Sequence, residues 1–142
     1  MERESRGVRV RIDRALRTME GQHRRLQEIH AELDVSVRRG DAKEVEAWID
    51  RLHSALRAHF EIEESVVFPA LAELEPDSAD RVGRLASEHG SILATLEALV
   101  GAPAVERGGA LGELQRRLAT HESDEESVVR QALDGPGRSL SR

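Results

Sequence analysis

The chain contains two copies of a histidine followed four residues later by a glutamate: His59 with Glu63, and His121 with Glu125. On an α-helix, residues four positions apart lie on the same face, so each pair points in one direction. Both pairs fall on stripes in which apolar residues recur every three or four positions, as on the buried side of a helix. Two further histidines interrupt apolar stripes upstream of these pairs. The complete set of candidate ligands is His23, His59, Glu63, His89, His121 and Glu125.

Residues of these types, buried together, require a cation. A buried carboxylate without compensation is costly and takes up a proton instead. Imidazole and carboxylate are ligands that suit iron, zinc and manganese. If each of two metal ions bound two histidines and shared both glutamates, a bridging oxide or hydroxide would make five bonds and leave one position open on each ion. We therefore predict a site for two metal ions, and iron, zinc or manganese would fit these ligands.

Two histidines are expected to lie outside this ligand set. His30 follows His23 by seven residues on the same stripe, which places it roughly 10 Å further along the helix. We expect His30 to line a channel or to contact a ligand from outside. His53 falls off its apolar stripe and is expected on the surface.

Four glutamates near the candidate ligands have different expected roles. Glu64 and Glu126 directly follow the glutamates of the two pairs, but they lie rotated off the buried stripe, so we expect them to be solvated or paired with arginines. Glu20 and Glu88 are better placed to accept a hydrogen bond from the second ring nitrogen of a histidine and so fix its orientation.

Helices must position these residues, and the sequence predicts four of them, over residues 8–39, 42–74, 79–100 and 104–134. Gly40-Asp41 ends the first helix, and Ser78 is a favourable N-cap for the third. Pro69 is expected to bend the second helix. Gly108-Gly109 would weaken the start of the fourth helix and move it towards Ala110.

Short connections between four helices favour an all-α, up-down-up-down four-helix bundle. We expect this domain to span residues 7–134, with disordered tails at 1–6 and 135–142. The apolar stripe of the second helix continues past its glutamate and predicts that Val66 and Ala70 face the core.

The two halves of the chain repeat one another. Residues 59–71 match residues 121–133 at eight of thirteen positions, and each segment is preceded by a helix with one histidine on its apolar stripe. Two such halves packed about a pseudo-twofold axis would bring two equivalent ligand sets together.

Composition excludes several other classes of protein. Only 2% of the residues are aromatic, whereas 34% are charged and the net charge is −6. This balance disfavours nucleic-acid binding, which needs a concentrated basic face. No apolar run approaches the length of a membrane span, and no leader sequence is visible, so we expect no membrane contact and a cytoplasmic location. The absence of cysteine excludes thiolate metal sites.

The motifs together carry a family resemblance. They are Gln22-His23-Arg24-Arg25-Leu26, His59-x-x-x-Glu63-Glu64 with Phe68-Pro69-Ala70-Leu71, Glu88-His89, and His121-x-x-x-Glu125-Glu126. The sequence resembles the hemerythrin-like (HHE cation-binding) family over roughly residues 10–133. That resemblance implies an up-down four-helix bundle with a non-haem di-iron centre. It also implies the following assignment: His23 and His59 on one iron, His89 and His121 on the other, and Glu63 and Glu125 bridging the two.

The sequence departs from the oxygen-carrying hemerythrins at two positions. Those proteins have a fifth histidine one turn after the ligand of the third helix, where this chain has Leu93. They also have an aspartate five residues after the last histidine, where this chain has Glu125 at four. Both differences argue against reversible oxygen carriage. With both irons open, peroxide can bridge them, and redox chemistry becomes more accessible.

We expect a di-iron protein that reacts with peroxide, dioxygen or nitric oxide, with catalase-like or peroxidase-like turnover of peroxide as the activity to test. A redox partner protein is a further candidate partner. The alternative is a non-enzymatic protein that binds or senses dioxygen, nitric oxide or iron. A ferritin-like carboxylate bundle normally shows two Glu-x-x-His motifs, but only Glu20-x-x-His23 fits here. A purely structural bundle is the remaining alternative.

Overall fold

The computed structural model describes residues 2–134, so the predicted tail at 135–142 lies outside the described residues. The described chain is helical almost throughout. Its elements in order are α1 (Glu2–Arg39), α2 (Ala42–Ile62), the π-helical turn η1 (Glu63–Val67), α3 (Phe68–Leu74), the 3₁₀ turn η2 (Pro76–Ser78), α4 (Ala79–Gly101) and α5 (Ala104–Asp134).

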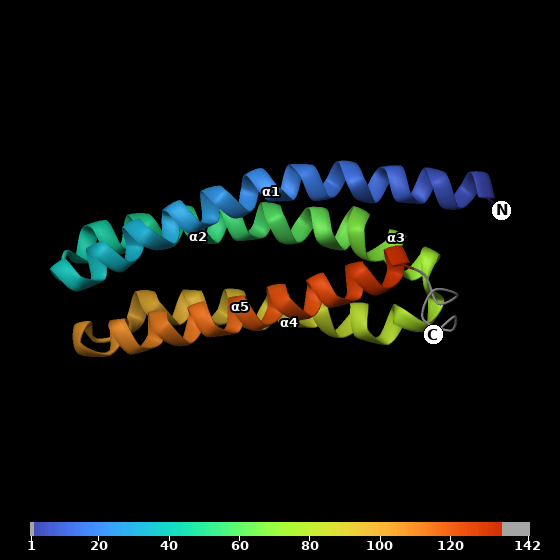
Figure 1. Cartoon of the computed structure of the whole chain (residues 1–142). Helices are drawn as coiled ribbons and strands as arrows, with labels where there is room; N and C mark the ends of the chain where they lie inside the picture. Colours follow the sequence, from blue (N-terminus) through green and yellow to red (C-terminus); the bar gives the residue numbers. More distant parts are fainter. Residues whose placement is uncertain (1, 135–142) are drawn as a thin grey trace.

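The helices form an up-down-up-down bundle (Figure 1). The long helices α1 and α2 lie antiparallel as one pair, and α4 and α5 lie antiparallel as a second pair. The pairs are joined side by side because α2 packs on α4 and α1 packs on α5. The predicted fold class is therefore confirmed.

A glycine and an aspartate make the turn between α1 and α2. Gly40 has a φ of 71°, in the left-handed region that residues with a Cβ rarely adopt. This conformation lets the amides of Gly40 and Asp41 donate to carbonyls of the last turn of α1. The Asp41 side chain then accepts from the backbone N–H of Glu44 and caps α2. The helix break predicted at these two residues is confirmed.

The predicted second helix is interrupted by one π-helical turn. Pro69 has no N–H, and its ring would clash with the carbonyl four residues earlier, at Ser65, in a regular α-helix. The amide of Phe68 instead donates to the carbonyl of Glu63, five residues back. The extra residue in this turn shifts the side chains by one position. Val67 is consequently buried and Val66 is 37% exposed, so the prediction that Val66 faces the core is wrong.

The apolar core has two parts, one on each side of the candidate ligands. Buried residues of 26–33, 45–60, 92–99 and 111–118 form one cluster. Buried residues of 8–19, 67–71, 82–85 and 128–132 form the other. The other candidate ligands lie between these segments, and His59 directly precedes Phe60 of the first cluster, so both clusters hold the helices that position them.

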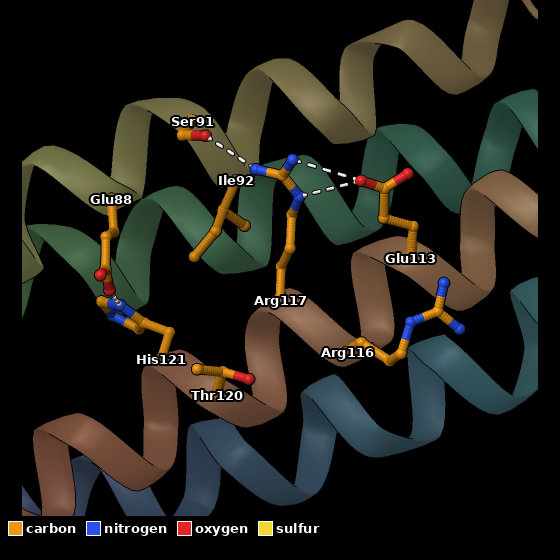
Figure 2. A pocket seen from close by; sticks show the side chains of 8 residues that line it. All are labelled: Glu88, Ser91, Ile92, Glu113, Arg116, Arg117, Thr120 and His121. Atoms are coloured by element: carbon orange, nitrogen blue, oxygen red, sulfur yellow. Dashed lines mark hydrogen bonds and ion pairs between the residues drawn. The ribbon is translucent and has the colours of Figure 1, made fainter.

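Exposed polar contacts join the rim of the bundle. Arg117 on α5 donates to Ser91 on α4 and to Glu113 one turn earlier on its own helix (Figure 2). Exposed ion pairs of this kind contribute little to the free energy of unfolding. The two apolar clusters are therefore the main source of stability.

Several predicted boundaries differ from the structure. α1 begins at Glu2, so residues 2–6, expected to be disordered, are helical. Ser78 does not cap α4, because its hydroxyl donates to the carbonyl of Glu75 at 2.6 Å. α5 begins at Ala104 and continues through Gly108 and Gly109, so these glycines do not move its start towards Ala110. Within the described part of the chain, every helix is too short or too polar to span a bilayer.

Candidate metal centre

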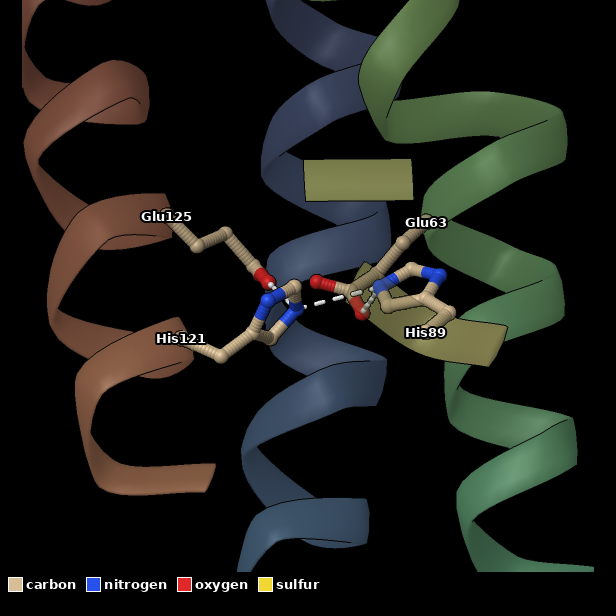
Figure 3. Close-up of side chains that lie close together, drawn as sticks. All are labelled: Glu63, His89, His121 and Glu125. Atoms are coloured by element: carbon tan, nitrogen blue, oxygen red, sulfur yellow. Dashed lines mark hydrogen bonds and ion pairs between the residues drawn. The ribbon is translucent and has the colours of Figure 1, made fainter. Parts of the chain in front are cut away.

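The candidate ligands come from all four long segments and meet near the middle of the bundle. Figure 3 shows Glu63 of η1, His89 of α4, and His121 and Glu125 of α5 pointing toward one another. One ligand atom from each of these four residues lies within 4.8 Å of the others, and all four side chains are buried. The two remaining histidines, His23 of α1 and His59 of α2, adjoin this group. The structure thus brings all six predicted ligands together.

The histidines are arranged as two close pairs. The Nε2 atoms of His23 and His59 are 3.2 Å apart, and those of His89 and His121 are 3.1 Å apart. Two nitrogens bound at right angles to one metal, each at about 2.1 Å, would be about 3 Å apart. One oxygen of Glu63 lies 3.2 Å from Nε2 of His89 and 3.6 Å from Nε2 of His59, so it stands between the two pairs.

The hydrogen bonds of the outer ring nitrogens fix the state of the inner ones. Nδ1 of His89 lies 3.0 Å from an oxygen of Glu64, and Nδ1 of His121 lies 2.7 Å from an oxygen of Glu88. An ionised carboxylate can only accept, so both Nδ1–H groups donate. The Nε2 atom of each neutral ring then carries a lone pair. Two lone pairs therefore face each other in the core, and only a proton or a metal ion between them makes this arrangement favourable.

The carboxylate of Glu63 has no hydrogen-bond donor of its own. Its side chain is 0% exposed, and neither oxygen receives a hydrogen bond from the described residues. Burial raises the pKa of Glu63 to about 11, and the neighbouring carboxylate of Glu125 acts in the same direction. Without a cation this group takes up a proton. A bound metal cation would instead neutralise its charge.

Burial keeps most of the buried imidazoles neutral, which is the form that binds metals. It lowers the pKa of His59 to about 4, with the nearby His23 contributing, and it also lowers the pKa of His89. Burial alone would lower the pKa of His121 as well, but contacts with carboxylates, Glu125 among them, raise it. In the metal-free protein a proton on His121 can therefore occupy the place of a metal ion.

Both phenylalanines of the chain lie against one of the histidines. The ring of Phe60 stacks on His89 with centroids 3.8 Å apart and planes at 5°, and Phe68 lies 5.6 Å from the same ring. Phe60 also contacts the edge region of His121 at 5.9 Å. These apolar contacts fix the ring orientations and exclude water from the histidine faces.

The two remaining histidines lie apart from the ligand set. His30 is half-buried, lines a cavity of about 290 Å³ that His23 also lines, and has a pKa lowered by burial. His53 was predicted on the surface, but it is half-buried and its ring bonds to Glu97 at 2.9 Å, which links α2 to α4. Apolar stripes cannot predict such a contact, because they do not say which polar residues of a neighbouring helix come close.

The outer glutamates follow the predictions only in part. Glu88 accepts a hydrogen bond from a histidine, as predicted. Glu126 pairs with Arg130 at 2.7 Å, also as predicted. Glu20 was predicted to accept a hydrogen bond from a histidine, but within residues 2–134 it accepts none and instead lines a cavity of about 360 Å³ beside His23.

Two hydrogen-bond partners of the histidines were not predicted. Glu64 was expected to be solvated or paired with an arginine, but the residue four positions later is Phe68, which cannot pair with it, and Glu64 accepts from a histidine instead. Gln22 accepts from Nδ1 of His59 at 2.9 Å. The sequence repeat could have predicted the role of Gln22, because Gln22 directly precedes the histidine of α1, just as Glu88 directly precedes the histidine of α4.

One comparison with known proteins identifies a family. The family described as Hemerythrin HHE cation binding domain matches residues 14–133. Searches among curated proteins and among solved structures each found no match to the chain. The family match covers most of the sequence and includes every candidate ligand. The chain therefore belongs to the hemerythrin HHE cation-binding domain family.

Proposed function

We propose that the chain binds two iron ions and uses them to react with a small ligand, with hydrogen peroxide as the leading candidate. The proposed ligands are His23 and His59 for one ion, His89 and His121 for the other, and Glu63 and Glu125 between the two. One observation carries the proposal: the Nε2 atoms of His89 and His121 lie 3.1 Å apart in the core, with both Nδ1 atoms turned outward to carboxylates. The uncompensated carboxylate of Glu63 beside them adds to the need for a cation.

The chemistry of the donors does not by itself choose between a redox metal and zinc. All candidate ligand atoms are imidazole nitrogen or carboxylate oxygen, which suit iron and manganese as well as zinc. Zinc has no redox chemistry in proteins. A reaction that moves electrons therefore requires iron or manganese, and the family resemblance favours iron.

Space for a small ligand adjoins the centre on the side of His23. One cavity of about 290 Å³ is lined by His23, His30 and Glu122, among others. A second cavity, of about 360 Å³, is lined by His23, Glu122 and Glu125, among others. Both are large enough for peroxide, dioxygen or nitric oxide. His23 is also less buried than the other three candidate histidines, so its surroundings are open to a ligand.

Peroxide disproportionation converts two molecules of H₂O₂ into two of water and one of dioxygen. When bound, a pair of iron ions would supply two electrons to one peroxide and recover two from the other. The residues around the cavities would bind the substrate and move its protons. Burial raises the pKa of Glu122, so this carboxyl retains a proton at a higher pH than an ordinary glutamate. His30 and Glu122 are therefore the proposed proton carriers of the cavity.

The presence of a leucine at position 93 supports the proposal that each metal ion keeps a coordination position open. Its side chain is half-buried and packs against the apolar core, where it offers no ligand atom. Coordination by the six proposed ligands, with two nitrogens per ion and shared carboxylates, leaves room for an exogenous ligand.

The test is metal content together with peroxide turnover. Protein made with iron should contain about two irons per chain and evolve dioxygen from peroxide. Glu63→Ala and Glu125→Ala should each lose iron and turnover to a similar extent. His53→Gln is the matched control, because this histidine contacts Glu97 and not the centre.

Absence of iron, or a final content of one iron per chain, would overturn the dinuclear proposal. Two irons without peroxide turnover would favour the alternative, a protein that binds or senses dioxygen, nitric oxide or iron.

A further inference from the structure

The two halves of the centre use corresponding residues to hold corresponding histidines. Nδ1 of His59 donates to Gln22, which directly precedes the histidine of α1. Nδ1 of His121 donates to Glu88, which directly precedes the histidine of α4. The hydrogen bonds are 2.9 and 2.7 Å long, so each acceptor fixes its imidazole in the same way. Gln22 and Glu88 are therefore equivalent positions of the pseudo-twofold repeat.

The equivalent positions differ in charge. Gln22 presents a neutral amide oxygen, whereas Glu88 presents a carboxylate. A carboxylate that accepts from an imidazole N–H raises the basicity of the other ring nitrogen and so strengthens its bond to a metal. The imidazole of His121 is consequently a stronger electron donor to a metal ion than the imidazole of His59.

A second carboxylate increases the same asymmetry. Glu64 accepts from Nδ1 of His89, so both histidines of this pair donate to carboxylates. The residue that corresponds to Glu64 in the repeat is Glu126, and it is held by Arg130 at 2.7 Å. The pair formed by His89 and His121 thus has two carboxylate partners, whereas His59 of the other pair has an amide.

We infer that the two metal positions are unequal, and that Glu88 and Gln22 are the positioning residues that rank them. This inference rests on the proposed dinuclear centre. The position on His89 and His121 fills first as metal is added, and the position on His23 and His59 fills second. Removing one outer partner of a ligating histidine typically costs 10–100-fold in metal affinity. The two dissociation constants of the wild type should therefore differ by at least about 10-fold.

Exchange of the two acceptors tests the ranking. The experiment is an anaerobic titration of the full-length metal-free protein with Fe²⁺, in which isothermal titration calorimetry measures the heat of each addition. Glu88→Gln should weaken the first step by about 10-fold or more and bring the two steps together. Gln22→Glu should strengthen the second step by a similar factor. Both substitutions preserve side-chain size, so circular dichroism should report the same helix content as in the wild type.

A matched control lies in the same cavity. Glu88 and Glu113 both line a cavity of about 320 Å³ between α4 and α5 (Figure 2). Glu113 bonds to Arg117 and not to a histidine. Glu113→Gln removes the same charge from this cavity and should leave both dissociation constants unchanged.

The outcomes separate this inference from the proposed function. If no variant, nor the wild type, binds two Fe²⁺ ions, the dinuclear proposal itself fails. If the wild type binds two ions with equal affinity, or if Glu88→Gln weakens only the second step, the ranking is wrong although the centre exists. A loss in Glu113→Gln equal to that in Glu88→Gln would also overturn the inference, because general charge and not the hydrogen bond to His121 would then set the affinity.

Discussion

The carboxylate of Glu63 would stabilise bound metal ions but destabilise the metal-free protein. Glu63→Gln keeps the size of the side chain and removes both its charge and its need for a proton. We therefore predict opposite effects in the two forms. At pH 8 the metal-free variant should melt at a higher temperature than the metal-free wild type. Addition of Fe²⁺ should raise the melting temperature of the wild type much more than that of the variant. The reason is that the variant lacks the carboxylate that lies between the two histidine pairs.

The magnitude follows from the raised pKa of Glu63. Burial raises it from 4.5 to about 11, so between these values the folded protein holds a proton that the unfolded chain has lost. Stability from this group is fully present below pH 4.5 and falls as the pH rises, by about 1.4 kcal/mol for each pH unit. Between pH 4.5 and pH 8 the metal-free wild type therefore loses about 5 kcal/mol of unfolding free energy through this group. Burial of the neutral amide costs about 1–3 kcal/mol. At pH 8 the unfolding free energy of the metal-free variant should therefore exceed that of the metal-free wild type by roughly 2–4 kcal/mol, which corresponds to roughly 6–12 °C in melting temperature.

The assay is differential scanning calorimetry of the metal-free proteins from pH 5.5 to 9. The pKa of His59 is lowered to about 4, so this group makes the protein more stable as the pH rises to 6.5 and has no further effect above it. Above pH 6.5 the wild type should lose stability with a steeper slope than Glu63→Gln. The control is Glu61→Gln, the same change at an exposed position two residues away, which should follow the wild type. Equal slopes for Glu63→Gln and the wild type, with no gain in melting temperature, would refute the reasoning.

Three further predictions concern protons, the open position and the π-helical turn. Metal binding at pH 7 should release protons, because ligands bind deprotonated: Glu63, whose pKa is raised to about 11, gives up about one, and the raised pKa of His121 adds to the release. Calorimetry in buffers of different ionisation enthalpy measures this, and heats independent of buffer would contradict it. Leu93→His should place an imidazole one turn after a ligand, slow peroxide turnover and prolong the life of the dioxygen adduct in stopped-flow spectra. Val67→Ala should lower the free energy of unfolding by roughly 2 kcal/mol in urea, whereas Val66→Ala should change it by less than about 0.5 kcal/mol; the reverse order would show a regular α-helix here.

The sequence predicted the inner part of the centre because helix periodicity alone determines it. His59 with Glu63, and His121 with Glu125, occupy the same face of their helices, and both pairs are buried as their stripes require. The outer hydrogen bonds depend on which helices become neighbours and at what height. Periodicity carries no such information, so the partner of His59, for example, could not be assigned from one helix.

Two identical pentapeptides show how far local sequence determines structure in this protein. Glu-Glu-Ser-Val-Val occurs at residues 63–67 and again at 125–129. The first copy forms the π-helical turn, and the second lies within regular α5. The sequences diverge directly afterwards, where Phe68-Pro69 stands in one half and Arg130-Gln131 in the other. The missing N–H and the ring of proline explain the backbone difference.

The same divergence explains the unequal partners of the histidines. In α5 the arginine four residues after the second glutamate of the pentapeptide holds that glutamate at 2.7 Å. In the other half a phenylalanine occupies this position, packs on His89, and leaves Glu64 to accept from the same imidazole. One aromatic residue thus both covers a face of the histidine and leaves the neighbouring carboxylate free to bond to it. The inferred asymmetry between the two proposed metal positions therefore originates in residues outside the proposed ligand set, in two copies of a motif whose proposed ligands are alike.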